Sequence, residues 1–202
     1  MLGGETGDGY ALIEDGGTAI VELAGTATET GARVLRALAA GVEVLLLAAA
    51  GCGEPGGGAG VVTAIEDGGG LSGATLVVLC EARVTAATAA PGTIAGALSA
   101  RYGAPLVHGP SFVLEQLDFH ARMRASRALV VGEPRLDAGT LGGRVAGEAA
   151  IAARQAGVPC HAIAEVNALD PFDVRILDLQ AILEAATIAA LEDAGERLAQ
   201  AL

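Results

Sequence analysis

The most informative segment of the sequence runs from Ala128 to Arg144 and reads ALVVGEPRLDAGTLGGR. Its apolar start, residues 128–131, has the length and the β-branched content of a buried strand, which we expect to stop at Gly132. A loop follows, and Thr140 is expected to open a helix that continues to Ala156. A strand that is followed closely by a helix is the repeating unit of an α/β fold.

Three charged side chains, Glu133, Arg135 and Asp137, come directly after this predicted strand. In open α/β sheets, ligands bind in the crevice beyond the carboxyl ends of the strands. Carboxylates in that place suit magnesium, and a guanidinium group suits phosphate. A plainer interpretation stays open, in which these residues form a salt bridge in a loop and Asp137 is favoured by the dipole of the following helix.

The composition indicates a folded chain with an unusual core. Of the 202 residues, 52% are hydrophobic but only 2% are aromatic, and there is no Trp. Such a core must consist of Ala, Val, Leu and Ile, which suits helices packed closely on a parallel sheet. The 30 glycines predict many tight turns and a modest stability unless a ligand or a partner chain contributes.

The charge of the chain excludes several classes of function. The formal net charge is −12, and every basic residue is Arg, with no Lys in the chain. Nucleic acids and anionic membranes are disfavoured partners because binding to them depends on clustered cations. A lysine phosphate clamp and Schiff-base chemistry are excluded, so any phosphate must be held by Arg, backbone amides or a metal ion.

No secretory signal precedes the first predicted elements, and the cytoplasm is the expected location. The most apolar run, Val42 to Ala50, is far shorter than the roughly 20 residues that span a bilayer, and we interpret it as an interior strand. The cysteines are three in number and widely separated, which predicts neither a disulfide framework nor a metal-binding pair. The three histidines have no second ligand at metal-binding spacing.

The first half of the chain predicts a smaller, mixed α/β unit. Two β-rich runs, Tyr10–Ile13 and 18–23, flank a turn signal and predict a hairpin. Residues 85–104 lose any clear periodicity, so they are our candidate for a linker. We therefore expect a first domain at residues 1–90 and a Rossmann-like α/β domain at residues 105–202.

The second half alternates apolar runs with amphipathic ones. We expect a strand at 158–164, at a sheet edge because of Pro159, a last short strand at 174–177 and a long helix at 180–202. Strands that alternate with helices imply a mainly parallel sheet with helical crossovers. The predicted fold class is therefore a three-layer α/β/α sandwich, joined to the smaller N-terminal unit.

A glycine-rich loop, residues 51–60, follows the predicted strand at 42–47. The backbone amides of Gly57, Gly58 and Gly60 could cradle a phosphate at a helix N-terminus. The loop lacks the Lys and the Ser or Thr of a P-loop, and Pro55 removes one amide donor. An ordinary glycine-rich turn is an equally good interpretation of this loop.

The stretch that opened this section resembles the late motif of the glycerate kinase family, which runs Gly-Glu-Gly-Arg-x-Asp-x-Gln-Thr-x-x-Gly-Lys. The matching positions are Gly132, Glu133, Arg135, Asp137, Thr140 and Gly143. The loop after the strand at 42–47 resembles the glycine loop of the same family. The opening motifs of the family, Pro-Asp-Ser-x-Lys and Asp-Gly-Gly-Glu-Gly, are not clear, so the chain resembles a shortened and diverged member.

This resemblance implies an ATP-dependent kinase that phosphorylates D-glycerate, with two α/β domains and an active site between them. It implies that Glu133 and Asp137 bind Mg²⁺ or orient the hydroxyl group, and that Arg135 contacts a phosphate. Magnesium is needed because ATP is itself an anion. The resemblance also assigns substrate or phosphate binding to Thr140, to the glycine loop, to Arg144 at the position of the family's Lys, and to Glu81 at that of its Asp.

Two further expectations concern partners. Because several motifs of the family are missing, the chain could instead be a non-catalytic relative that binds a nucleotide or a small organic acid, or that serves as a partner subunit. A truncated sheet edge would expose unpaired backbone groups, so we expect a homodimer or another covered edge.

Overall fold

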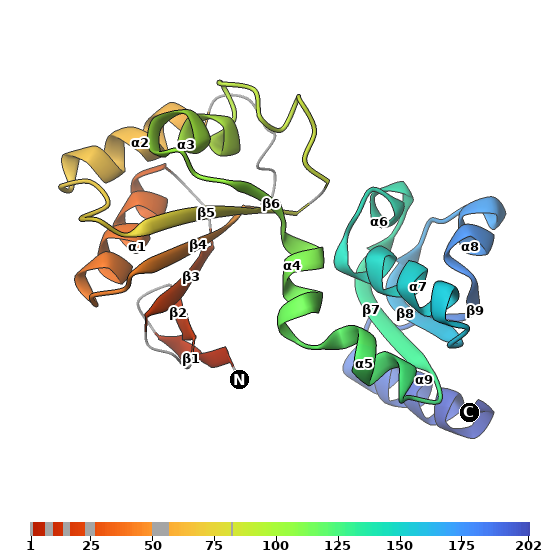
Figure 1. Ribbon diagram of the computed structural model, residues 1–202. Helices are drawn as coiled ribbons and strands as arrows, with labels where there is room; N and C mark the ends of the chain where they lie inside the picture. Colours follow the sequence, from red (N-terminus) through yellow and green to blue (C-terminus); the bar gives the residue numbers. More distant parts are fainter. Residues whose placement is uncertain (1, 7–9, 14–16, 23–26, 50–56, 82) are drawn as a thin grey trace. The chain divides into compact units, whose positions relative to one another are not determined.

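The structure is a computed structural model that describes residues 2–6, 10–13, 17–22, 27–49, 57–81 and 83–202. The chain divides into two compact units, Met1–Gly109 and Pro110–Leu202 (Figure 1). Each unit has its own sheet and its own hydrophobic core. The chain is thus α/β, with sheets flanked by helices, as the sequence predicts.

The first unit contains a six-stranded sheet with the order β1-β2-β3-β4-β5-β6. Its strands are β1 Leu2–Thr6, β2 Tyr10–Ile13, β3 Thr18–Glu22, β4 Val44–Ala49, β5 Thr75–Cys80 and β6 Leu106–His108. The first three strands are antiparallel to one another, whereas β3 to β6 are parallel. The predicted hairpin is confirmed, because β2 and β3 pair with Leu12 opposite Ala19.

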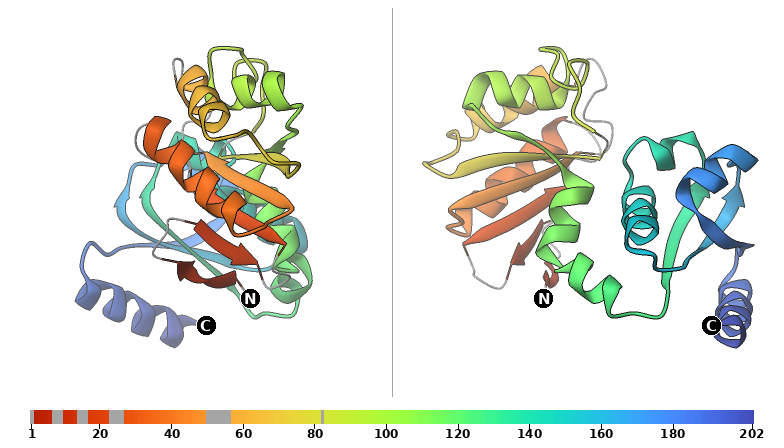
Figure 2. Two further views of the ribbon diagram at one scale, coloured as in Figure 1. Left: turned by 90° about the vertical axis from the view of Figure 1, so that its left-hand side faces the viewer. Right: turned by 45° about the vertical axis from the view of Figure 1, so that its right-hand side comes forward.

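Three helices pack on the parallel strands of this unit: α1 Ala27–Ala39, α2 Gly58–Asp67 and α3 Ile94–Tyr102. Their buried residues share one core with alternate residues of the strands, such as Leu45 and Leu47 of β4. Figure 2 shows α1, in orange, lying over the strands of the sheet. Helix α1 begins before Thr30, and this threonine is buried within the helix.

The segment expected as a linker, residues 85–104, contains α3. This helix begins where Thr93 accepts a hydrogen bond from the amide of Gly96, at 2.9 Å, and it ends at Gly103 in the left-handed conformation. Ala95 and Leu98 are buried in the core of the first unit. The division between the units falls at Gly109, so the first unit is the longer one and not the smaller unit that we expected.

The second unit contains a parallel three-stranded sheet with the order β7-β8-β9. The strands are β7 Leu129–Leu136, β8 Cys160–Asn167 and β9 Leu179–Glu184. The helices are α4 Gly109–Gln116, α5 Phe119–Arg124, α6 Ala138–Leu141, α7 Val145–Ala156, α8 Pro171–Leu177 and α9 Ile188–Ala201.

Helices α7 and α9 lie on opposite faces of this sheet. Val131 and Ala162 belong to the buried core together with residues of α7. The next residues along the same strands point the other way, since Ile163 lines a groove whose far wall is Leu191 of α9. The three-layer arrangement predicted for the second half is thus present in this unit (Figure 1).

Four local predictions for the second unit are wrong. Residues 174–177 belong to helix α8 and not to a strand, because Asp170 accepts hydrogen bonds from the first amides of the helix and Pro171 occupies its first turn. The predicted helix at 180–202 begins with β9 instead. The predicted helix at 140–156 is divided into α6 and α7 by Gly142 and Gly143. Strand β8 is central, with Pro159 lying just before it.

No helix in the described part of the chain is both long enough and apolar enough to cross a membrane.

Candidate functional site

Strand β7 is longer than the sequence predicts, and this changes where the charged residues lie. It does not stop at Gly132 but continues to Leu136, with Glu133 opposite Ala164 and Arg135 opposite Val166 of β8. Pro134 is tolerated because β7 is an edge strand of the three-stranded sheet. Glu133 and Arg135 are therefore fixed by strand pairing, and only Asp137 lies beyond the strand.

Asp137 begins helix α6 with a capping box. Its Oδ1 accepts a hydrogen bond from the amide of Gly139 at 2.8 Å, and the hydroxyl of Thr140 accepts one from the amide of Asp137 at 3.2 Å. Such reciprocal bonds satisfy backbone donors that the start of a helix leaves free. Asp137 therefore has a structural role at the start of the helix, in line with the plainer of the two interpretations given for it above.

Thr140 also joins the cap to the strand. It is 1% exposed, and its hydroxyl donates a hydrogen bond to Oε2 of Glu133 at 2.7 Å. The other carboxylate oxygen of Glu133, Oε1, lies 3.6 Å from the guanidinium of Arg144. Glu133 is thus a nearly buried carboxylate, held at both oxygens.

Arg144 lies between the two carboxylates. Its Nη1 is 3.4 Å from Oδ1 of Asp137 as well as 3.6 Å from Glu133. Arg135 approaches Asp137 from the other side, with its Nε 3.5 Å from Oδ2. The structure thus brings together all five residues of the motif that were assigned a role, Glu133, Arg135, Asp137, Thr140 and Arg144, in a group that we call the charged cluster. Its two negative and two positive charges balance.

Exposure differs across the charged cluster and indicates which groups can meet a ligand. The side chain of Glu133 is 13% exposed, that of Asp137 30%, that of Arg144 36% and that of Arg135 57%. Arg135, Arg144 and Asp137 therefore form the outer part of the cluster, and Glu133 forms its inner part. A ligand would reach these three side chains before Glu133.

Sequence reasoning missed a residue that supports this cluster. Gly147 lies in the first part of α7, and a Cβ atom built there would overlap the carbonyl oxygen of Thr140. Only a glycine lets α7 pack this closely against α6. Its place in the sequence, four residues after Gly143, gives no local signal for this role.

The donor set of the charged cluster fits Mg²⁺ in type. Magnesium prefers oxygen ligands and is usually bound by one or two carboxylates together with substrate phosphates and waters. Asp137 and Glu133 supply such carboxylates, and Asp137 is the more exposed of the two. Among the described residues, no group of three or more His, Cys, Asp or Glu side chains forms a metal site made by protein ligands alone.

The other predicted binding residues belong to the first unit. Residues 51–56 of the glycine loop lie outside the described residues, whereas Gly57 caps α2 and Gly58 and Gly60 lie inside it. A Cβ atom at Gly58 would overlap the carbonyl oxygen of Thr93 before α3, so close helix packing already requires a glycine there. Glu81 follows the last residue of β5 and is exposed. Phosphate binding by these residues stays a prediction.

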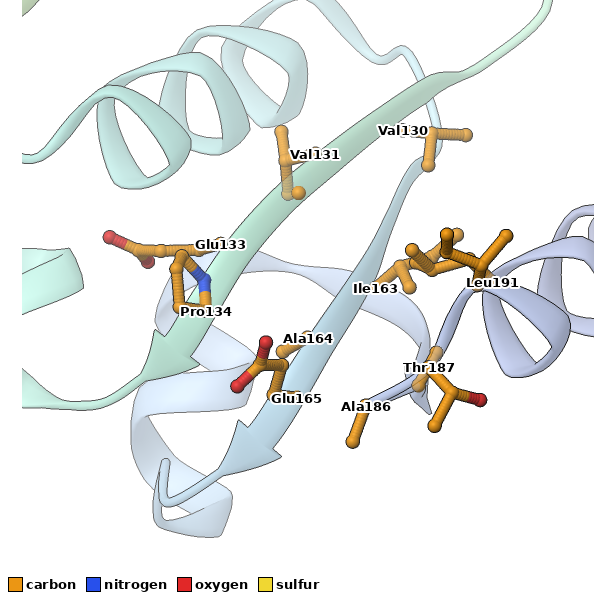
Figure 3. A pocket seen from close by; sticks show the side chains of 13 residues that line it. Val130, Val131, Glu133, Pro134, Ile163, Ala164, Glu165, Ala186, Thr187 and Leu191 are labelled. Carbon is orange, nitrogen blue, oxygen red and sulfur yellow. The ribbon is translucent and has the colours of Figure 1, made fainter.

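A groove of about 480 Å³ lies on the face of the second sheet opposite α7 (Figure 3). Its walls come from β7, β8 and the start of α9. Glu133 also lines the groove, but Figure 3 shows its carboxylate pointing away from Ile163 and Leu191. His161, on the groove side of β8, is 8% exposed, and neither of its ring nitrogens has a hydrogen-bond partner among the described residues.

The geometry defines a class of protein: an α/β protein whose charged cluster sits where a parallel strand meets a helix. The sequence profile of the glycerate kinase family matches residues 70–202, which include the whole second unit. The chain therefore belongs to the glycerate kinase family, as its late motif predicts. This membership supports a kinase-like function.

Solved structures support the fold. The chain is similar to the crystal structure of a protein designated glycerate kinase 2 from Salmonella typhimurium LT2, with a TM-score of 0.59 and 20% sequence identity. The similarity covers 93% of this chain and 74% of that one. At this identity the likeness is one of fold. A comparison with curated proteins gave no match.

Proposed function

We propose that this protein is an ATP-dependent phosphotransferase that moves the γ-phosphoryl group of ATP to a hydroxyl group of D-glycerate. The observation that supports this most is the charged cluster. The family motif is preserved there as a connected set of contacts, with the Thr140 hydroxyl on Glu133 and the Arg144 guanidinium between two carboxylates.

In the reaction, the bond between the γ-phosphorus and the oxygen that bridges it to the β-phosphate breaks. A bond from the substrate hydroxyl oxygen to the γ-phosphorus forms, and the hydroxyl proton leaves. Phosphoryl transfer depends mainly on positioning and on charge neutralisation, so a rigid set of charges is the main requirement. Strand pairing and the α6 cap provide that rigidity for Glu133 and Asp137.

Each member of the charged cluster has a proposed role. Asp137 orients the substrate hydroxyl and accepts its proton, because it is the more exposed carboxylate. Arg135, 57% exposed, contacts a phosphate oxygen with its guanidinium. Glu133 and Thr140 are proposed positioning residues that hold Arg144 beside Asp137. Mg²⁺ held by Asp137 and Glu133 would neutralise charge on the phosphates.

The test is a coupled assay of ADP release with ATP, Mg²⁺ and D-glycerate. We expect turnover for the wild type and a loss of at least about a hundredfold in kcat for Asp137→Asn, which keeps the size of the side chain but removes its charge. Glu133→Gln should lose activity as well. The matched control is Asp193→Asn, because Asp193 forms an exposed pair with Arg197 within α9.

Three results would distinguish a kinase from a non-catalytic relative. Loss of turnover in both cluster variants, with Asp193→Asn unchanged, supports the kinase. ATP that raises the melting temperature without any turnover supports the alternative, a non-catalytic relative that binds a nucleotide or a small acid. Full activity in Asp137→Asn would refute the proposed role of the cluster.

Three further proposals accompany this function. Glu81, Gly57, Gly58 and Gly60 take part in substrate or phosphate binding, as the family resemblance implies. The protein works in the cytoplasm, where ATP is available. It forms a homodimer, which sedimentation analysis over a range of concentrations would detect.

A further inference from the structure

Helix α9 presents an apolar stripe that its own unit leaves uncovered. Ala194 and Leu198 are buried and α9 contacts β9, so one face of the helix packs on its own sheet. On the neighbouring face, Ile188 is 77% exposed, Leu191 47% and Leu202 38%. Large hydrophobic side chains that are exposed in a row along one helix mark a surface at which proteins interact.

The stripe has the same spacing when it is read in either direction. Its members follow one another at intervals of 3, 4, 4 and 3 residues along α9: Ile188, Leu191, Gly195, Ala199 and Leu202. Residues three and four apart lie on one face of a helix, so these side chains form one row. The amide of Leu202 donates to the carbonyl oxygen of Leu198 at 3.1 Å, so helical geometry continues to the last member. Such a symmetric surface matches a second copy of itself about a two-fold axis.

Gly195 lies at the centre of the stripe, and no contact within the described part of the chain requires a glycine there. A Cβ atom built at Gly195 would meet nothing within 4 Å, and its φ is not positive. By contrast, a Cβ atom at Gly58 or Gly147 would overlap a backbone oxygen. Glycine weakens a helix interior relative to alanine. A second helix that crosses α9 at Gly195 would explain it, because the distance between packed helices depends on the side chains at the contact.

The groove on the second sheet continues this apolar surface from α9 onto β7. Ile188 and Leu191 line it together with Val130, which is 45% exposed (Figure 3). A ligand confined to the groove would leave Gly195 and Leu202 uncovered. A helix laid along α9 would instead cover the whole stripe and the adjoining side of the groove.

We infer that the apolar stripe of α9 is the contact surface between two copies of this chain, whose α9 helices run antiparallel and cross at Gly195. Ile188 then faces Leu202 of the second copy, and Leu191 faces the smaller Ala199, so that large and small side chains interdigitate. An unrelated helix is a poorer partner, because only a second copy repeats the 3-4-4-3 spacing and covers both stripes at once. This inference rests on the proposed homodimer, whose surface it names, and not on the kinase reaction.

The test is sedimentation equilibrium of the full chain over a range of protein concentrations. We expect the wild type to form dimers, and we expect Leu191→Asp and Gly195→Gln each to raise the dissociation constant at least about tenfold. The first places a charge at the contact, and the second holds the helices apart. Ala189→Gln is the matched control, because Ala189 is exposed on another face of α9 and the change there should leave the dimer intact.

Cross-linking tests the crossing point directly. Two-fold pairing at Gly195 brings the thiols introduced by Gly195→Cys close together, so mild oxidation should link the two copies through a disulfide. Ala189→Cys places its thiol on another face of α9 and should give no such link. Equal linking of the two variants would overturn the inference.

The outcomes separate the surface, the homodimer and the reaction. A dimer that neither Leu191→Asp nor Gly195→Gln weakens would overturn the inference, because the copies then meet elsewhere. A wild type that stays monomeric at all concentrations would overturn the inference together with the proposed homodimer. A dimer that both variants weaken, without any ADP release in the kinase assay, would support the inference and refute the proposed reaction.

Discussion

The two units of this chain build their cores from different side chains. The first unit has a six-stranded sheet and buries large residues such as Leu45, Leu47, Ile65 and Leu98 completely. The second unit has three strands, and its core contains Ala146, Ala149, Ala150, Ala153, Ala162 and Ala164. Yet the family match includes all of the second unit and only the last part of the first.

The unit with the smaller core thus carries the charged cluster, whose side chains are held by several contacts. Small side chains let α7 lie close to β7 and β8, and Gly147 lets α7 lie close to Thr140 of α6. An alanine core buries less apolar area, so it contributes less stabilisation for each residue than a leucine core does. The second unit therefore depends more heavily on its few large side chains.

The largest expected effect comes from removing one of those side chains. Leu136 is 1% exposed and directly precedes Asp137, so Leu136→Ala should destabilise the second unit by about 2–5 kcal/mol. Leu45→Ala should cost the first unit a similar amount, from a larger core. Urea unfolding followed by circular dichroism, with ADP release as the second readout, would measure both.

We expect the two variants to affect different parts of the unfolding curve. Leu136→Ala should lower the transition of the second unit and leave the first unit folded, and Leu45→Ala should do the reverse. A single transition that both variants lower equally would contradict this expectation, because it would show that the units unfold together.

A smaller effect is expected for Gly147→Ala. The added methyl group would overlap the carbonyl oxygen of Thr140, and such overpacking typically costs about 1–3 kcal/mol. Because Thr140 holds Glu133, kcat should fall more than KM rises. Gly195→Ala is the control: it lies in a helix with open space around it and should raise stability slightly. Equal stability and activity in both variants would contradict the proposed packing role of Gly147.

The smallest effect concerns a buried thiol of the second unit. Burial raises the pKa of Cys160 from 9.0 to about 11, and the nearby charge of Asp178 adds to this increase. The folded state therefore keeps the thiol proton between pH 9 and pH 11 while the unfolded chain loses it. The free energy of unfolding should consequently fall as pH rises above 9, by about 1 kcal/mol at pH 10.

Cys160→Ala isolates this contribution. Its stability should be less sensitive to pH above 9 than that of the wild type, which denaturation at pH 8, 9 and 10 would show. An identical pH dependence in the two proteins would mean that the thiol does not contribute.

Much of the fold follows from local signals in the sequence. The hairpin of β2 and β3 has two short β-rich runs on either side of a turn signal in the sequence, and the apolar run of β4 has the length of an interior strand. By contrast, β9 reads LQAILE, a sequence of good helix formers. It becomes a strand because it pairs with β8, and such tertiary pairing overrides a weak local preference.

The family motif predicted which residues form the site but not all of the secondary structure around them. The motif identified the five residues of the charged cluster. Glu133 and Arg135 were nevertheless expected in a loop, because their β-pairing depends on a partner strand about thirty residues later in the chain. Gly147 and the groove could not be found in this way. The role of Gly147 depends on how α7 packs on α6, and the groove depends on how α9 packs on the sheet, and no local pattern of residues records either.

Pro134 has one further consequence. Pro134 lies within β7, which is an edge strand of the three-stranded sheet. Having no N–H, it offers no donor to an incoming chain, and prolines in edge strands hinder extension of a sheet. The proline thus protects an eight-residue edge strand against aggregation by strand addition.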